Sequence, residues 1–216
     1  MTDRHHPAAC DCERIRPGLI GQPVNALSSL AYVVAGVALC VRARRRDDRA
    51  PTSTVFGALV AANGIGSAGF HGPGGRLAHW LHDTALLGTL ATMAVENVVS
   101  MGERGTRAAV PAATVATGVA AAALLAAPAS TNVLSVAVGA AATSTQAVAA
   151  ARADLSPETR RRLAWSAALM CVASVANRLS RTGGPCCRPD SRLQGHALWH
   201  VLTAASLYEW GASTSG

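Results

Sequence analysis

A run of 44 consecutive residues without a charged side chain, from Ala108 to Ala151, is the feature that most restricts the fold. A surface helix of a soluble protein carries polar residues along one face, because that face meets water. A membrane-spanning helix instead needs about 20 mostly apolar residues. The run therefore predicts two successive membrane spans, divided near the turn-forming segment 128–132.

The rest of the chain shows the same division into long apolar stretches and short charged islands. Half of the 216 residues are hydrophobic, and only 14% are charged. We predict an all-α integral membrane protein, a seven-helix bundle that forms a single domain over residues 1–216. The predicted spans are 22–41, 52–71, 77–101, 108–127, 132–151, 163–180 and 194–210.

The distribution of arginine predicts the orientation in the membrane. The chain has 19 basic residues, all of them Arg, and a net charge of +7. We interpret this charge as anchoring cytoplasmic loops rather than binding nucleic acid. We therefore predict an external amino terminus and a cytoplasmic carboxyl terminus. Eleven arginines fall in the loops after the first, third and fifth spans, against eight elsewhere: Arg42, Arg44, Arg45, Arg46, Arg49, Arg104, Arg107, Arg152, Arg160, Arg161 and Arg162.

Five of the seven histidines lie in or beside predicted spans, and several align with other polar residues. His196 and His200 are four residues apart, so they share one face of the seventh span. Such a pair is a standard way for a helix to present two imidazoles to zinc. Ser67 and His71 share a face at the end of the second span, with Asn63 one turn deeper. The topology places these groups near the external membrane surface, where they form a candidate metal site.

Asp83 is a further candidate for chemistry, because it lies inside the third span. An ionised carboxylate in a bilayer is costly unless it is paired or lies beside a cation. Glu96 and Arg178 raise the same question, and they could pair with each other or reach the membrane surface. For His79 and His82, beside a loop, we favour an interfacial or hydrogen-bonding role over a ligand role. Three histidines with an open position are the ligand set of catalytic zinc.

Several short motifs resemble the alkaline ceramidase family. They are the segments 66–71 (GSAGFH) and 195–203 (GHALWHVLT), with an Asp at the start of the third span between them. The residues CE at 12–13, followed by QPVNALS at 22–28, are similar to the amino terminus of that family. The family belongs to a superfamily of seven-span zinc membrane hydrolases and receptors that includes the adiponectin receptors. The resemblance touches most of the region 10–208, and the block at 195–203 is its most specific part.

The resemblance implies a zinc ion held by His71, His196 and His200, with Ser67 and Asp83 as catalytic residues close by. Zinc would lower the pKa of a bound water and polarise the carbonyl of a lipid amide. Asp83 would accept the proton of that water and pass it to the leaving amine. Ser67 would donate a hydrogen bond to the oxyanion or orient the water. The expected substrate is ceramide or a related N-acyl lipid, which reaches the site from the membrane.

The chain departs from the family pattern at two places. His82 directly precedes Asp83, so the carboxylate could be displaced by one position. His82 is then a candidate supporting partner of the site, as is Asn63. Eukaryotic members hold calcium with several amino-terminal acidic and amide groups. Here zinc is the expected ion and calcium is left in doubt, because the corresponding region offers only Asp11, Glu13, Gln22 and Asn25.

The six cysteines fall into two groups. Two lie within spans and are expected to be inert packing residues: Cys40 and Cys171. Four fall on the predicted external side, where they could form disulfides or bind a metal: Cys10, Cys12, Cys186 and Cys187. We expect a bridge from Cys12 to Cys187, which also fits the family, or to the adjacent Cys186.

Three functions are compatible with these residues. The first is a zinc-dependent hydrolase that cleaves the amide bond of ceramide or a related N-acyl lipid. The second is a zinc-containing receptor or sensor of the same superfamily, and the third is a transporter in which Asp83, Glu96 and Arg178 form a relay. We favour the first, because the sequence shows no sizeable cytoplasmic domain to signal through and no inverted repeat. The expected location is the cell membrane, with the active site near the external face.

Overall fold

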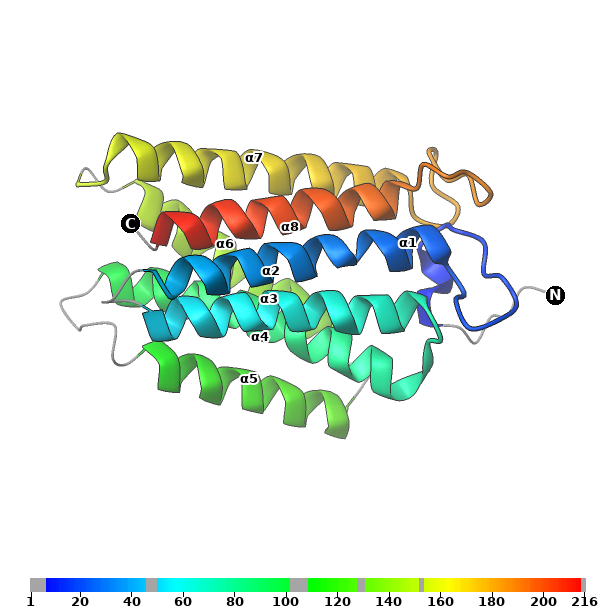
Figure 1. The fold of residues 1–216 in the computed structure, drawn as a ribbon, viewed down its shortest axis with the longest axis horizontal. Coiled ribbons are helices and arrows are strands. Elements are labelled where there is room, and N and C mark those ends of the chain that lie inside the picture. The colour runs from blue at the N-terminus through cyan, green and yellow to red at the C-terminus, as the bar shows by residue number, and fades with distance from the viewer. Residues whose placement is uncertain (1–6, 46–49, 102–108, 128–130, 152–153, 215–216) are drawn as a thin grey trace.

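The computed structural model describes residues 7–45, 50–101, 109–127, 131–151 and 154–214 (Figure 1). Within these ranges the chain is helical and contains no strand, which confirms the predicted all-α class. The long helices lie along a common axis, and the chain passes back and forth between the two ends of the bundle.

Every predicted span overlaps a helix. The first predicted span corresponds to two helices, α1 (Pro23–Ser28) and α2 (Leu30–Ala43), which follow a short 3₁₀ turn, η1 (Pro7–Cys10). The remaining helices are α3 (Ala50–His71), α4 (Gly75–Met101), α5 (Ala109–Ala126), α6 (Thr131–Ala150), α7 (Pro157–Leu179) and α8 (Gly195–Thr214).

Helix α7 begins earlier than the predicted span 163–180. Ser156 caps its amino terminus, since the Ser156 Oγ accepts a hydrogen bond from the Thr159 N–H at 3.1 Å. Pro157 occupies the first helical turn, where its missing N–H costs nothing. The first turns of α7 are polar, so the apolar pattern alone placed the start of this span at residue 163.

Among the described residues, four helical segments are long and apolar enough to cross a membrane: Pro23–Ala43, Thr52–His71, Ala109–Ala126 and Val133–Ala150. Helices α4 and α8 are less apolar because they turn polar residues inward. Asp83 and Glu96 of α4 are buried, as are His200, Thr203 and Ser206 of α8. The apolar helices indicate a membrane protein, and its buried polar groups lie on α4 and α8 as well as on α3, which carries Asn63, Ser67 and His71.

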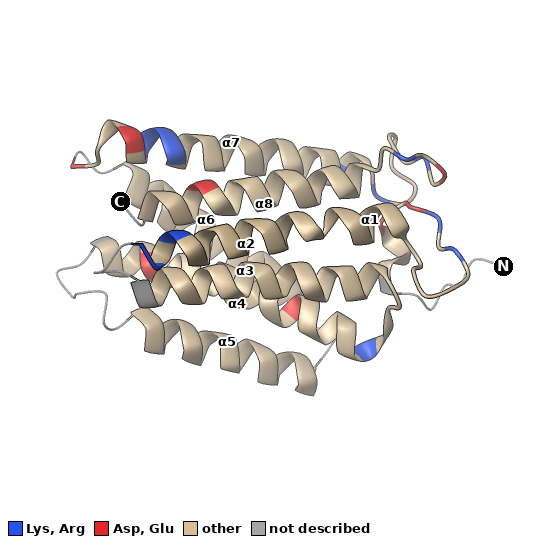
Figure 2. Ribbon diagram, in the orientation of Figure 1, with Lys and Arg blue, Asp and Glu red and all other residues tan. Residues whose placement is uncertain are grey.

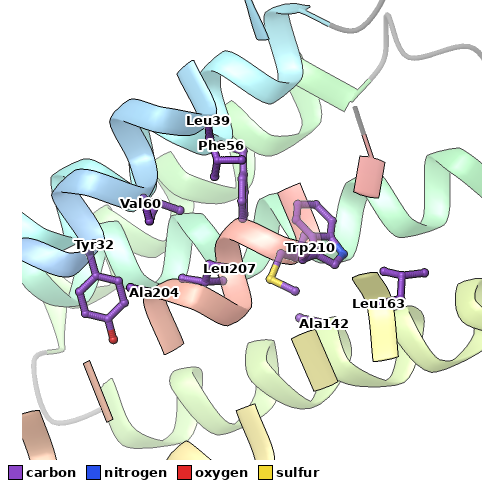
Figure 3. Close-up of a cluster of buried hydrophobic side chains, with 11 residues drawn as sticks. Tyr32, Leu39, Phe56, Val60, Ala142, Leu163, Ala204, Leu207 and Trp210 are labelled. Carbon is purple, nitrogen blue, oxygen red and sulfur yellow. The ribbon is translucent and has the colours of Figure 1, made fainter. Parts of the chain in front are cut away.

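A cluster of buried apolar side chains fills the space between the helices (Figure 3). The rings of Phe56 and Trp210 pack at 4.6 Å between centroids. The Trp210 indole N–H donates to Asn97 Oδ1 at 3.2 Å, which satisfies its only donor. Small residues let the helices approach closely, and a Cβ added to Gly36 on α2 would overlap the α3 backbone. Side chains from α2, α3, α4, α6, α7 and α8 complete this core: Tyr32, Leu39, Val60, Met93, Ala142, Leu163, Ala204 and Leu207.

Glu96 and Arg178 lie at opposite ends of the bundle. Glu96 is buried and lines a small cavity with Trp210. Arg178 is exposed and follows Asn177, whose side chain contacts His196. His196 and Trp210 are 14 residues apart on α8, which is about 21 Å along the helix. The suggested ion pair between Glu96 and Arg178 is therefore wrong.

A disulfide joins Cys12 to Cys187, and both Cys10 and Cys186 are free thiols. The bridge ties the amino-terminal segment to the loop between α7 and α8. The neighbouring Arg14 guanidinium adds two hydrogen bonds to the Asp190 carboxylate, at 2.6 and 2.7 Å. Covalent and polar contacts thus hold the same two segments together.

We expect loss of this disulfide to lower the thermal stability of the protein. Cys12→Ser would be made in a background with Cys10→Ser and Cys186→Ser, so that neither neighbouring thiol can replace the lost partner. The melting temperature should fall, in line with the loss of about 2–4 kcal/mol that removing a long-range disulfide usually causes. The background variant alone should melt like the unmodified protein. Equal melting temperatures with and without Cys12 would show that the bridge adds no stability.

Candidate metal centre

Three histidines from two helices meet at the end of the bundle that carries the amino-terminal segment. His71 is the last residue of α3, and His196 and His200 lie in the first two turns of α8. The ring centroid of His71 is 5.0 Å from that of His196 and 5.1 Å from that of His200, and the two α8 rings are 4.5 Å apart. One ligand atom of each histidine lies within 4.8 Å of the other two, which is close enough for all three to bind one ion.

Each of these rings is held through its Nδ1 atom by a side-chain oxygen from another segment. Metal-binding histidines usually have such a partner, which fixes the ring and leaves Nε2 as the ligand. The contacts are Nδ1 of His71 to Gln22 Oε1 at 2.7 Å, Nδ1 of His196 to Asn177 Oδ1 at 2.9 Å, and Nδ1 of His200 to Ser28 Oγ at 2.9 Å. The donor set therefore fits a metal bound through three Nε2 atoms.

Two glycines allow the helices that carry the site to touch. A Cβ added to Gly66 on α3 would lie 2.7 Å from the backbone nitrogen of His82 on α4. A Cβ added to Gly195 at the start of α8 would overlap the side chain of Ser180. Both glycines thus serve close backbone approach, which brings α4 and the end of α7 next to the histidines.

Asp83 lies on α4 beside the contact between Gly66 and His82. Its carboxylate is 2.9 Å from His82 Nδ1 and 3.1 Å from His79 Nε2, and its side chain is only 8% exposed. Phe70 packs against the rings of both His82, at 5.0 Å, and His71, at 5.1 Å. The group formed by Asp83, His79 and His82 is therefore a neighbour of the three-histidine cluster, and both of its histidines contact the Asp83 carboxylate.

Ser67 and Asn63 lie on the inner face of α3, below His71. Ser67 is fully buried, and its Oγ is 2.9 Å from Ser29 Oγ and 3.4 Å from His200 Nε2. Asn63 is buried one turn deeper, and its Oδ1 has no hydrogen-bond partner among the described residues. The structure therefore brings Ser67 to the histidines and places Asn63 beneath them.

The acidic residues of the amino-terminal segment are engaged by protein groups. The Asp11 carboxylate is 3.5 Å from His196 Nδ1 and 3.7 Å from the Arg181 guanidinium. Burial raises the pKa of the Asp11 carboxyl, and Arg181 opposes that shift. The Glu13 carboxylate accepts hydrogen bonds from the backbone N–H groups of Val24 and Asn25, each at 2.8 Å. These carboxylates thus support α1 and His196.

The sequence interpretation identified the three histidines but missed the side chains that hold their rings. Asn177 gave a usable signal, since it is an amide near the external end of a predicted span. Gln22 and Ser28 occur in a motif that was noted, yet no spacing rule connects them to histidines that are distant in the chain. No protein-family model, curated protein or solved structure matches this chain.

Proposed function

We propose that this chain is a zinc-dependent membrane hydrolase that cleaves the amide bond of ceramide or a related N-acyl lipid. The observation that carries the proposal is the cluster of His71, His196 and His200, with each Nδ1 held by a side-chain oxygen. Three protein nitrogens with an open position are typical of catalytic zinc, whereas structural zinc sites have four protein ligands. The motif resemblance to alkaline ceramidases supports the choice of substrate.

The proposal includes seven membrane crossings with an external amino terminus and a cytoplasmic carboxyl terminus. Figure 2 shows arginines at both ends of the bundle: at the end of α2 and the start of α7, and at the opposite end in the amino-terminal segment and the loop between α7 and α8. Because arginine is enriched in cytoplasmic loops, the count of eleven arginines against eight in the sequence supports an external position for the histidine cluster. Six of the 19 arginines counted in the sequence lie outside the described residues: Arg4, Arg46, Arg49, Arg104, Arg107 and Arg152.

Asp83 is the proposed general base and acid. Zinc, when bound, acts as a Lewis acid and brings the pKa of water towards neutrality. The Asp83 carboxylate would accept a proton from the attacking water and return it to the leaving amine. Its hydrogen bonds to His79 and His82 hold the carboxylate in place.

The direction of the hydrogen bonds among the buried serine hydroxyls supports a water-orienting role for Ser67. The Ser29 hydroxyl donates to the Asn25 carbonyl at 2.8 Å, so its oxygen is left to accept. The Ser67 hydroxyl then donates to Ser29 Oγ, and its lone pairs face His200 Nε2. Of the two roles expected for Ser67, accepting a hydrogen bond from the attacking water is therefore favoured over donating one to the oxyanion.

A receptor of the same superfamily would retain the three histidines, and it is the second candidate. The group around Asp83 favours the hydrolase. A protein that only binds the metal has no need of a buried carboxylate with two histidine partners, whereas hydrolysis needs a group that accepts and returns a proton.

The proposed activity can be tested with purified protein in lipid nanodiscs. The assay would measure fatty-acid release from ceramides and other N-acyl lipids, alongside ester lipids with the same acyl chain. We expect release from at least one amide lipid and little from its ester counterpart. A protein that binds zinc but releases no fatty acid from any amide lipid would favour the receptor.

A further inference from the structure

The amino-terminal segment supplies a contact to each of the three histidine rings. Asp11 approaches His196, Ser28 holds His200, and Gln22 holds His71. We infer that Gln22 is a positioning residue that fixes the ring and the tautomer of His71 for metal binding. This inference rests on the metal site of the proposed function. It assigns a role in metal binding to a residue that is not itself a ligand.

The orientation of the Gln22 amide follows from its donors. Its Nε2 group donates to the Ala8 carbonyl at 2.9 Å and to the Glu13 carbonyl at 2.7 Å, so both of its N–H bonds are used. The reversed amide would place an oxygen against two carbonyl oxygens. Gln22 Oε1 therefore faces His71 Nδ1, 2.7 Å away, and can only accept. His71 must carry its proton on Nδ1, which presents the Nε2 lone pair as the ligand.

Gln22 also fixes the backbone of His71. The Gln22 backbone N–H donates to the His71 carbonyl at 2.8 Å, and the Gly21 N–H donates to the Gly72 carbonyl at 2.9 Å. His71 ends α3, where carbonyl groups lack partners within the helix. One residue thus holds both the ring and the main chain of this histidine, and both His71 and Gln22 are completely buried.

Contacts that need no metal hold Gln22 in place. The Asn25 side-chain amide donates a hydrogen bond to Gln22 Oε1 at 3.2 Å. The Glu13 carbonyl accepts a hydrogen bond from Gln22, and the Glu13 carboxylate caps α1. The disulfide of Cys12 anchors the same segment to the loop before α8. The His71 ring is therefore preorganised, and a preorganised ligand binds with less loss of conformational freedom.

Two substitutions at Gln22 separate positioning from general structural support. Gln22→Leu removes the acceptor and both donors, whereas Gln22→Glu keeps an acceptor for His71 Nδ1 but loses the donors to Ala8 and Glu13. The measurements are the zinc dissociation constant, by competition with a chromogenic chelator, and the melting temperature of the metal-free protein. We expect the dissociation constant to rise about 10–100-fold in Gln22→Leu, the usual effect of removing a ligand's partner. Gln22→Glu should stay close to the unmodified protein, even if its melting temperature falls.

The inference would be overturned if the zinc affinities of the two variants did not differ in this way. If Gln22 only holds the amino-terminal segment, Gln22→Glu should weaken zinc binding as much as Gln22→Leu does. Unchanged zinc affinity in Gln22→Leu would also overturn the inference, but it would leave the metal site itself intact. Failure of the unmodified protein to bind zinc would instead refute the proposed function. Should Gln22→Leu not fold, the ¹⁵N chemical shifts of His71 in the metal-free unmodified protein still decide. A proton on Nδ1 is expected, and a proton on Nε2 would contradict the assignment.

Discussion

The variant His200→Ala is expected to lose most of the zinc that the unmodified protein binds, which should be about one ion per chain. In the part of the chain that the structure describes, the cluster offers three histidine nitrogens, so removing one leaves two, too few for a stable zinc site. The loss of affinity should exceed the roughly 10–100-fold effect of removing an outer partner such as Gln22. His71→Ala and His196→Ala should behave in the same way, because each supplies one of the three ligands.

The matched controls are His79→Ala and His82→Ala, which remove an imidazole from the neighbouring group around Asp83. Both histidines contact the Asp83 carboxylate, so their loss should leave the zinc content near that of the unmodified protein. Metal content of the purified variants can be measured by mass spectrometry. Retention of zinc in His71→Ala together with its loss in His82→Ala would show that the ligand set has been assigned to the wrong histidines.

The variant Asp83→Asn is expected to keep its zinc and its fold but to lose nearly all amide hydrolysis. Asn is close to Asp in shape, and its amide can still hydrogen-bond to a neighbouring histidine. It cannot accept the proton of the attacking water, and a general acid–base contribution of about 10²- to 10⁴-fold in rate should disappear. The measurement is fatty-acid release from the best amide substrate, compared with the zinc content of the same preparation.

Glu96→Gln is the matched control for this carboxylate. Glu96 is also a buried acid on α4, but it lies 13 residues further along, about 20 Å away, beside the apolar core. Turnover should therefore stay close to that of the unmodified protein. Near-normal turnover in Asp83→Asn would exclude the assigned mechanism, whereas loss of zinc in that variant would make Asp83 a metal ligand.

The sequence predicted the helices and the pairing of His196 with His200 because both depend on short-range patterns, whereas the place of His71 in the cluster followed from the family resemblance. A long uncharged run requires apolar helices, and the spacing of His196 and His200 places them on one helical face. The two glycines that bring α4 and α7 to the site were present in the motifs that carried the resemblance. Their role in close packing follows only from the structure, because it depends on their contacts with His82 and Ser180.

The division between α1 and α2 and the partners of the histidines could not be predicted in the same way. Ser28 and Ser29 both donate their hydroxyl protons to the Asn25 carbonyl, and such bonds compete with the helical backbone pattern. This explains why the predicted span 22–41 is interrupted at Ser29. Contacts such as that of His200 with Ser28 join residues far apart in the chain, so only the packed bundle reveals them.

The most direct test is a zinc titration of fatty-acid release by metal-free protein in nanodiscs that contain ceramide or the best amide substrate. The proposed function predicts negligible release without metal, a linear rise as zinc is added, and a plateau near one zinc per chain. Release that is equally fast without metal would contradict a catalytic role for the three histidines. Saturation of the site with zinc but no release of fatty acid would contradict the hydrolase itself.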